Sequence, residues 1–182
     1  MQTVRATARH GRAIDAVSDL LARLRIECIF VGNVARSAWL GSVVERGSID
    51  VVALMRDEQK NQVAMMGSHR GFHLDHDEVQ RTEELDLVPM KFADDEGDIR
   101  MHVLLATNAL YGRMVSAGVE ADWNGQTIKV PRAEDLALLL AVSDDEGSAR
   151  DCEMMIRLPE FDRRLYNQRL VSIGLPHMAV AE

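Results

Sequence analysis

The 182-residue sequence has few aromatic side chains, few cysteines and no long apolar run. Phe, Trp and Tyr make up 4% of the chain against ten methionines, so we expect an aliphatic core in which methionine fills irregular gaps. Cys28 and Cys152 lie far apart, which favours two free thiols in a reduced compartment over a disulfide. Residues 136–142 form the longest aliphatic stretch, and the basic N-terminus lacks a following signal-peptide core. These features predict a cytoplasmic protein with no membrane span.

The sequence also has fewer basic than acidic residues. The chain carries 21 Lys and Arg against 29 Asp and Glu, which gives a formal net charge of -8. A nucleic-acid-binding protein usually presents a broad basic face to the phosphate backbone, so nucleic acid is not an expected partner. A local basic pocket within an acidic protein is still compatible with this composition.

Apolar periodicity predicts alternating helices and strands along the first 130 residues. Residues 12–24 carry one apolar helical face, and residues 27–31 form a short apolar run typical of a buried strand. In residues 99–105 apolar and polar side chains alternate, which predicts a strand with one core face and one polar face. By the same criteria we expect helices at 34–40, 56–68 and 107–116, and strands at 48–55, 71–75 and 88–93. Residues 87–105 have the pattern of a hairpin, and residues 123–130 contain an Asn-Gly turn signal and a final strand.

After Pro131 the pattern becomes helical, with helices expected at 133–142, 148–158 and 161–170. We therefore predict an α/β (α+β) fold with a mixed sheet and flanking helices. The expected domain organisation is an α/β core at residues 1–130 and a C-terminal helical segment at 131–182, packed on the core as a single structural unit.

The most informative stretch reads Val-Gly-Asn-Val-Ala-Arg-Ser-Ala-Trp-Leu-Gly at 31–41 and Arg-Gly-Ser-Ile-Asp-Val-Val at 46–52. A strand, a glycine turn, a short helix and a strand with an acidic residue follow one another here. This arrangement resembles the nucleotidyltransferase superfamily, in particular its small bacterial, toxin-associated-like members. The resemblance covers roughly residues 12–158 and implies a nucleotidyltransferase-like mixed sheet. In that family two aspartates on one strand and a third carboxylate on a later strand hold Mg²⁺ against a triphosphate.

The carboxylate set of that family is incomplete in this chain. Ser48 stands at the first aspartate position, Asp50 keeps the second, and His102 stands at the third. The resemblance implies that these three are the catalytic residues, that Asp50 is the residual metal ligand, and that Gly32 and Asn33 contact the nucleotide. A single carboxylate holds Mg²⁺ poorly unless phosphates and water supply the other ligands, so magnesium is expected only as a weakly held cofactor.

Basic residues flank this altered site. Arg46, Ser48 and Asp50 are expected to share one face, and Arg100 and His102 to share the face opposite. Two arginines, a hydroxyl and the backbone amides of the glycine turn could bind a nucleotide phosphate or another small anion without a cation. In the competing interpretation, these side chains only pair with nearby acids.

Two functional hypotheses follow. The first is nucleotidyl transfer from a nucleoside triphosphate to an unknown acceptor, or residual nucleotide binding at a degenerate metal site. The second is a catalytically inactive scaffold on the same fold, with a protein partner in a toxin–antitoxin-like pair or a second copy in a homodimer. The fold alone does not decide between them, because one fold serves many functions.

A second polar cluster lies between residues 69 and 77. Its imidazoles and carboxylates are common metal ligands, but their spacing matches no metal motif. On a strand, His73 and Asp75 would point away from Phe72 and Leu74, as on an exposed edge strand. We therefore predict a solvated face for this cluster, which consists of His69, His73, Asp75, His76 and Asp77.

Overall fold

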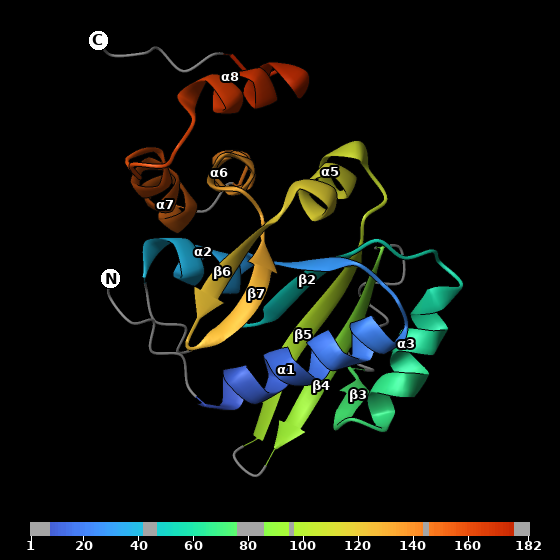
Figure 1. Ribbon diagram of the computed structural model, residues 1–182. Helices are drawn as coiled ribbons and strands as arrows, with labels where there is room; N and C mark the ends of the chain where they lie inside the picture. Colours follow the sequence, from blue (N-terminus) through green and yellow to red (C-terminus); the bar gives the residue numbers. More distant parts are fainter. Residues whose placement is uncertain (1–7, 42–46, 76–85, 95–96, 144–145, 177–182) are drawn as a thin grey trace. The chain divides into compact units, whose positions relative to one another are not determined.

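The computed structural model describes residues 8–41, 47–75, 86–94, 97–143 and 146–176 (Figure 1). The chain divides into two compact units, residues 1–130 and 131–182. Over the described ranges, no helix combines the length and the hydropathy that crossing a membrane requires. The mixed α/β architecture agrees with the fold class that the sequence predicted.

A five-stranded mixed sheet forms the centre of the first unit, with strand order β1-β2-β5-β4-β3. The strands β2 and β5 run parallel, and every other neighbouring pair is antiparallel. The predicted hairpin is present as β4 and β5, and the predicted edge strand is β3. The bounds are β1 (Cys28–Val31), β2 (Ile49–Ala53), β3 (Phe72–Leu74), β4 (Leu87–Asp94) and β5 (Gly97–Leu105).

One face of this sheet packs against the helices α1 (Ala8–Arg23) and α3 (Gln59–Ser68) (Figure 1). The packing is close: a side-chain carbon added at Gly67 of α3 would lie 3.5 Å from Leu20 of α1 and 3.3 Å from Phe72 of β3. The apolar stripe of α1 is buried, as its helical spacing predicted. The helix begins at Ala8, however, four residues before the predicted start at residue 12.

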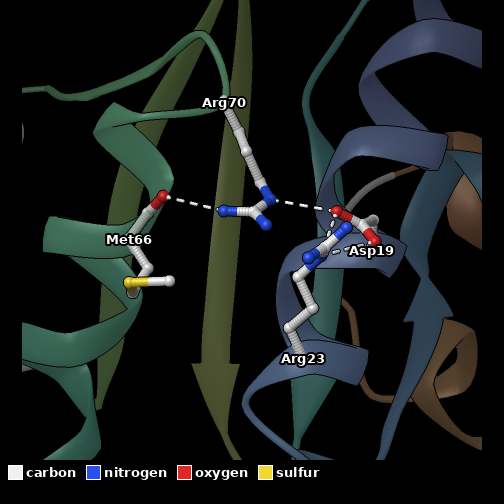
Figure 2. A network of polar contacts seen from close by, with 4 residues as sticks. All are labelled: Asp19, Arg23, Met66 and Arg70. Carbon is white, nitrogen blue, oxygen red and sulfur yellow. Dashed lines mark hydrogen bonds and ion pairs between the residues drawn. The ribbon is translucent and has the colours of Figure 1, made fainter.

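A polar network connects α1 with α3 and the turn that follows it (Figure 2). Arg70 Nε donates to Asp19 Oδ2 at 3.0 Å, and Arg70 Nη1 donates to the Met66 carbonyl oxygen at 3.5 Å. Arg23 Nε donates to both oxygens of Asp19 at 2.9 Å. The hydrogen bond from Arg70, followed by that from Arg23, lowers the pKa of Asp19, so this carboxylate stays ionised and keeps both arginines in place.

The alternation predicted along β5 is confirmed. Ile99, Met101, Val103 and Leu105 are buried, whereas the residues between them are exposed or half-buried. The opposite side of the sheet, which we call the polar face, carries Asp98, Arg100 and His102 of β5, Asp50 of β2, Lys91 of β4 and His73 of β3. The helix α5 (Ala109–Ala117) contacts β1 and β2.

A two-stranded hairpin completes the first unit, built from β6 (Val119–Trp123) and β7 (Gln126–Val130). Asn124 and Gly125 both have positive φ, 55° and 82°, as expected for an Asn-Gly hairpin turn. The sequence predicted this turn and the strand after it, but β6 was not predicted. Trp123 Nε1 donates to Ser37 Oγ at 2.8 Å and so connects β6 to α2 (Gly32–Leu40).

The polar cluster in and around β3 corrects one prediction. His69 and His73 are exposed, as predicted for a solvated face. Asp75 is buried, with 5% of its surface exposed, and its Oδ1 lies 2.8 Å from Lys91 Nζ. The prediction was wrong for Asp75 because β4 supplies a lysine that compensates its charge. The other two members, His76 and Asp77, lie outside the described residues.

The second unit contains the helices α6 (Ala133–Ala141), α7 (Glu146–Ile156) and α8 (Arg163–Ser172). Two buried acids in the first turn of α6 connect it to α8. Glu134 Oε1 accepts a hydrogen bond from the Asp162 amide at 2.6 Å, and Asp135 Oδ1 lies 3.2 Å from Arg169 Nε. Asp162 in turn caps α8 by accepting from the Leu165 amide.

Both cysteines are free, as predicted. Burial raises the pKa of the Cys28 thiol in β1 to about 11 and also raises that of Cys152 in α7. Both thiols therefore stay protonated at neutral pH, which fits a packing role better than a nucleophilic one.

Candidate functional site

The centre of the candidate site is a contact between Asp50 of β2 and His102 of β5. The parallel register of these strands places the two residues directly opposite each other. His102 Nδ1 lies 2.7 Å from Asp50 Oδ1, and the side chains are 21% and 23% exposed, respectively. Asp50, Arg100 and His102 therefore share the polar face. The prediction that Arg100 and His102 lie on the face opposite Asp50 was wrong, because adjacent residues of paired strands point the same way.

This contact orients the imidazole of His102. A carboxylate accepts hydrogen bonds and does not donate when it is ionised, so Nδ1 is the nitrogen that carries the proton toward Asp50. In the neutral ring Nε2 is then left as a hydrogen-bond acceptor. A half-exposed histidine held in this way is chemically suited to take a proton from a bound hydroxyl.

Gly32 brings the start of α2 against the second oxygen of Asp50. It is the first residue of α2 and has a φ of +56°, a conformation that glycine adopts without strain. A side-chain carbon at this position would lie only 2.7 Å from Asp50 Oδ2. The N-cap residue, Val31, provides no side-chain hydrogen bond to the first amides of α2. An anion would therefore be favoured at this helix start.

The side chain of Asn33 is held by contacts with neighbouring residues of the site. Its Oδ1 accepts a hydrogen bond from Arg36 Nη2 at 2.6 Å. Its Nδ2 lies so close to Gly47 that a side-chain carbon there would be 2.6 Å away, and Gly47 itself has a φ of +117°. Asn33 thus supports the chain just before Ser48, and its contact with a nucleotide stays a prediction. Arg46 lies outside the described residues.

A cavity of about 400 Å³ lies next to the Asp50–His102 contact. The pairing of β2 with β5 begins at Met101, so the first residues of β5 have no β2 neighbour, and the cavity adjoins this segment. Ser48 comes immediately before β2 and is half-buried. The residues that line the cavity are Arg9, His10, Gly47, Ser48, Asp98, Ile99, Arg100 and His102.

The first turn of α1 contributes two of these residues, which sequence reasoning missed. Arg9 Nη2 donates to the Gly97 carbonyl oxygen at 2.7 Å. His10 is buried, and its pKa is lowered by burial first and by the charge of Arg9 second, while a hydrogen bond with the Gly47 backbone opposes the shift. The signal was available, because His10 precedes Ile14 and Val17 at helical spacing and so belongs to the buried stripe.

The charges around the cavity are unevenly compensated. Asp98 Oδ2 lies 3.7 Å from His73 Nε2. Arg100 is exposed and has no hydrogen bond or ion pair with any residue that the structure describes. The carboxylate of Asp98 is thus directed toward the edge strand β3. The guanidinium group of Arg100 has no competing partner among the described residues and is available to a ligand.

The donor atoms do not fit a protein-held pair of magnesium ions. Within the described ranges, no group of three His, Cys, Asp or Glu side chains is placed to hold a metal. Among the described residues, Asp50 is the one carboxylate at the centre of the site, and one of its oxygens already binds His102. Magnesium prefers several oxygen ligands in near-octahedral geometry, which this set cannot provide.

Comparisons with known proteins identify the fold. No protein-family model matches the sequence, and no curated protein matches it. Among solved structures, antibiotic-resistance factor ANT(2'')-Ia is 12% identical with a TM-score of 0.50, covering 88% of this chain and 92% of that one. An antigenic nucleotidyltransferase-like protein from Paracoccidioides brasiliensis is 14% identical with a TM-score of 0.49, covering 90% and 88%. At such identities the likeness concerns the fold alone, and the fold of this chain is nucleotidyltransferase-like.

Proposed function

We propose that this protein binds a nucleoside triphosphate beside Gly32 and Asp50 and transfers its nucleotidyl group to an acceptor hydroxyl. One observation carries the proposal: Asp50 and His102, two of the three residues that the sequence resemblance assigns to the reaction, lie 2.7 Å apart on a half-exposed face. The nucleotidyltransferase-like fold supports it.

In the proposed reaction His102 acts as the general base. The acceptor oxygen attacks the α-phosphorus, the bond from that phosphorus to the bridging oxygen breaks, and pyrophosphate leaves with the bonding electrons. The acceptor proton moves to His102 Nε2, and Asp50 stabilises the imidazolium that forms. This assignment uses the orientation of His102 and does not require a third carboxylate.

Arg46 and the first amides of α2 are proposed as contacts of the triphosphate, whereas Arg100 and Ser48 are proposed as contacts of an anion in the adjoining cavity. Three carboxylates would repel a triphosphate unless cations neutralised them, whereas a single aspartate paired with a histidine needs less compensation. We propose that the metal site is degenerate, so that Mg²⁺ reaches the protein mainly as an ion already bound to the nucleotide.

The proposal is tested by pyrophosphate release from a γ-labelled nucleoside triphosphate, with water as the acceptor, and by calorimetric binding of a non-hydrolysable analogue. Asp50→Asn and His102→Gln should each lower the release rate by about 10²-fold. The matched control is Asp57→Asn, because Asp57 is an exposed acid that pairs only with Lys60 among the described residues. Each protein is assayed with Mg²⁺ and with EDTA.

Equal rates in the wild type, both site variants and the control would show that the site does not act on nucleotides. A wild type that neither binds the analogue nor releases pyrophosphate would favour the scaffold hypothesis, with a toxin–antitoxin-like partner or a second copy as the ligand. Binding without release would leave only the residual nucleotide-binding form of the proposal.

A further inference from the structure

The cavity beside β5 is adjacent to the reacting centre but does not contain it. Neither Gly32 nor Asp50 lines it, although His102 does. His102 therefore borders two places at once: the carboxylate of Asp50 on its Nδ1 side, and the cavity. A molecule in the cavity would lie next to the proposed base, which is where an acceptor has to be.

Two guanidinium groups from different elements line this cavity. Arg9 comes from the first turn of α1 and is positioned by its hydrogen bond to the Gly97 carbonyl oxygen, 2.7 Å long. Arg100 comes from β5 and has no partner within the part of the chain that the structure describes. Asp98, the one acid among the described residues of the wall, is directed at His73 instead. With neutral histidines, the described lining residues carry two positive charges against one negative charge.

We propose that this cavity binds a phosphate group of the acceptor, with Arg9 and Arg100 as its guanidinium donors. The inference rests on the proposed function, because it names the chemical class of that reaction's acceptor: a phosphorylated compound with a free hydroxyl. Guanidinium groups bind phosphate through paired N–H donors, and the Ser48 hydroxyl adds one more donor in the same wall. The volume of about 400 Å³ accommodates a small organic phosphate.

His10 supports this assignment from the buried side of the cavity. It is 6% exposed and hydrogen-bonded to the Gly47 backbone, so it fixes the wall between Arg9 and Ser48. Burial first and the charge of Arg9 second lower the pKa of His10, so the guanidinium group of Arg9 acts on this side of the wall. A positive wall around an open volume favours an anionic ligand.

The test measures binding of inorganic phosphate by calorimetry, to the free protein and to the protein saturated with a non-hydrolysable nucleoside triphosphate analogue. Phosphate should bind in both cases, and Arg9→Gln and Arg100→Gln should each weaken it at least tenfold. Arg23→Gln is the matched control, because Arg23 is an exposed arginine at the other end of α1. Arg9→Lys keeps the charge without the planar donor pair and should retain part of the affinity. Thermal unfolding confirms that each variant is folded.

The arms of this experiment separate the inference from the proposed function. Phosphate that the analogue displaces one for one would assign the cavity to the nucleotide's own phosphates and overturn the acceptor assignment. Analogue binding without any phosphate binding would leave the proposed function standing and remove the inference. Phosphate binding that depends on both arginines, without analogue binding, would support the anion site and contradict the nucleotide site. Equal losses in Arg23→Gln would also overturn the inference.

Discussion

Asp50 in the first unit and Asp135 in the second are both paired carboxylates, but their surroundings differ. Asp135 is 0% exposed and lies 3.2 Å from Arg169. Asp50 is 23% exposed and lies 2.7 Å from His102. An arginine keeps its charge at every pH that proteins tolerate, whereas a histidine gains and loses a proton near neutrality.

This difference distinguishes a pair that only stabilises the fold, Asp135 with Arg169, from a pair that could also take part in proton transfer, Asp50 with His102. A buried carboxylate whose partner cannot release a proton holds two helices together and has no means of transferring a proton. A half-exposed carboxylate with a histidine partner contributes less to stability, because water screens it, but it can support proton transfer. Burial and partner type together therefore favour Asp50 over Asp135 for the proposed chemistry.

The largest expected effect comes from breaking the buried pair. Asp135→Ala should lower the free energy of unfolding by about 3 kcal/mol, because Arg169 would lose its compensating charge. Asp50→Ala should cost less than about 1 kcal/mol, as expected for a partly exposed pair. Urea denaturation of both variants measures the contrast. Equal losses of stability would show that the two pairs do not differ in the way that their burial indicates.

A smaller loss of stability is expected from Gly32→Ala, because the added carbon would contact the carboxylate of Asp50. The positive φ should cost about 1–2 kcal/mol, and the new methyl group would displace the Asp50 carboxylate. Gly125→Ala is the matched control, because Gly125 has a φ of +82° and no atom within 4 Å of the added carbon. Both variants should lose similar stability, but pyrophosphate release should fall only in Gly32→Ala. A similar fall in both would contradict a role for the Gly32–Asp50 approach.

The smallest expected effect is on the pH dependence of stability, and it comes from the buried histidine His10. The pKa of His10 is lowered on folding, so below the usual value of 6.5 the unfolded chain binds a proton that the folded chain does not. Its contribution is complete above that value and is lost as pH falls. Stability measured between pH 7.5 and pH 5 should therefore fall more in the wild type than in His10→Asn. Parallel curves would show that His10 is not titrating in this range.

The sequence predicted those parts of the fold that local patterns determine. The alternation in β5 and the Asn-Gly turn before β7 are short-range signals, and both are confirmed. The strand β6 was missed even though it alternates, because Glu120 and Asp122 on its exposed side reduce its apolar character. The early start of α1 was missed because Arg9 and His10 are polar, although one of them is buried.

The site was only partly predictable for a physical reason. The sequence resemblance named Asp50 and His102 but could not show whether their side chains lie on the same face of the sheet. Alternation fixes the two faces of one strand, whereas the relation between two strands depends on which strands pair and in what register. Here that register joins residues 52 positions apart, and no local pattern encodes it. The contribution of α1 to the cavity wall depends in the same way on tertiary packing.

The parallel pairing of β2 and β5 also has a consequence for the growing chain. Asp50 leaves the ribosome 52 residues ahead of His102, and the hairpin of β4 and β5 has to be synthesised before the two can meet. Any fragment that ends before β5 contains Asp50 but lacks His102, the residue that Asp50 contacts in the folded protein. The protein therefore cannot form its central pair until β5 has been synthesised.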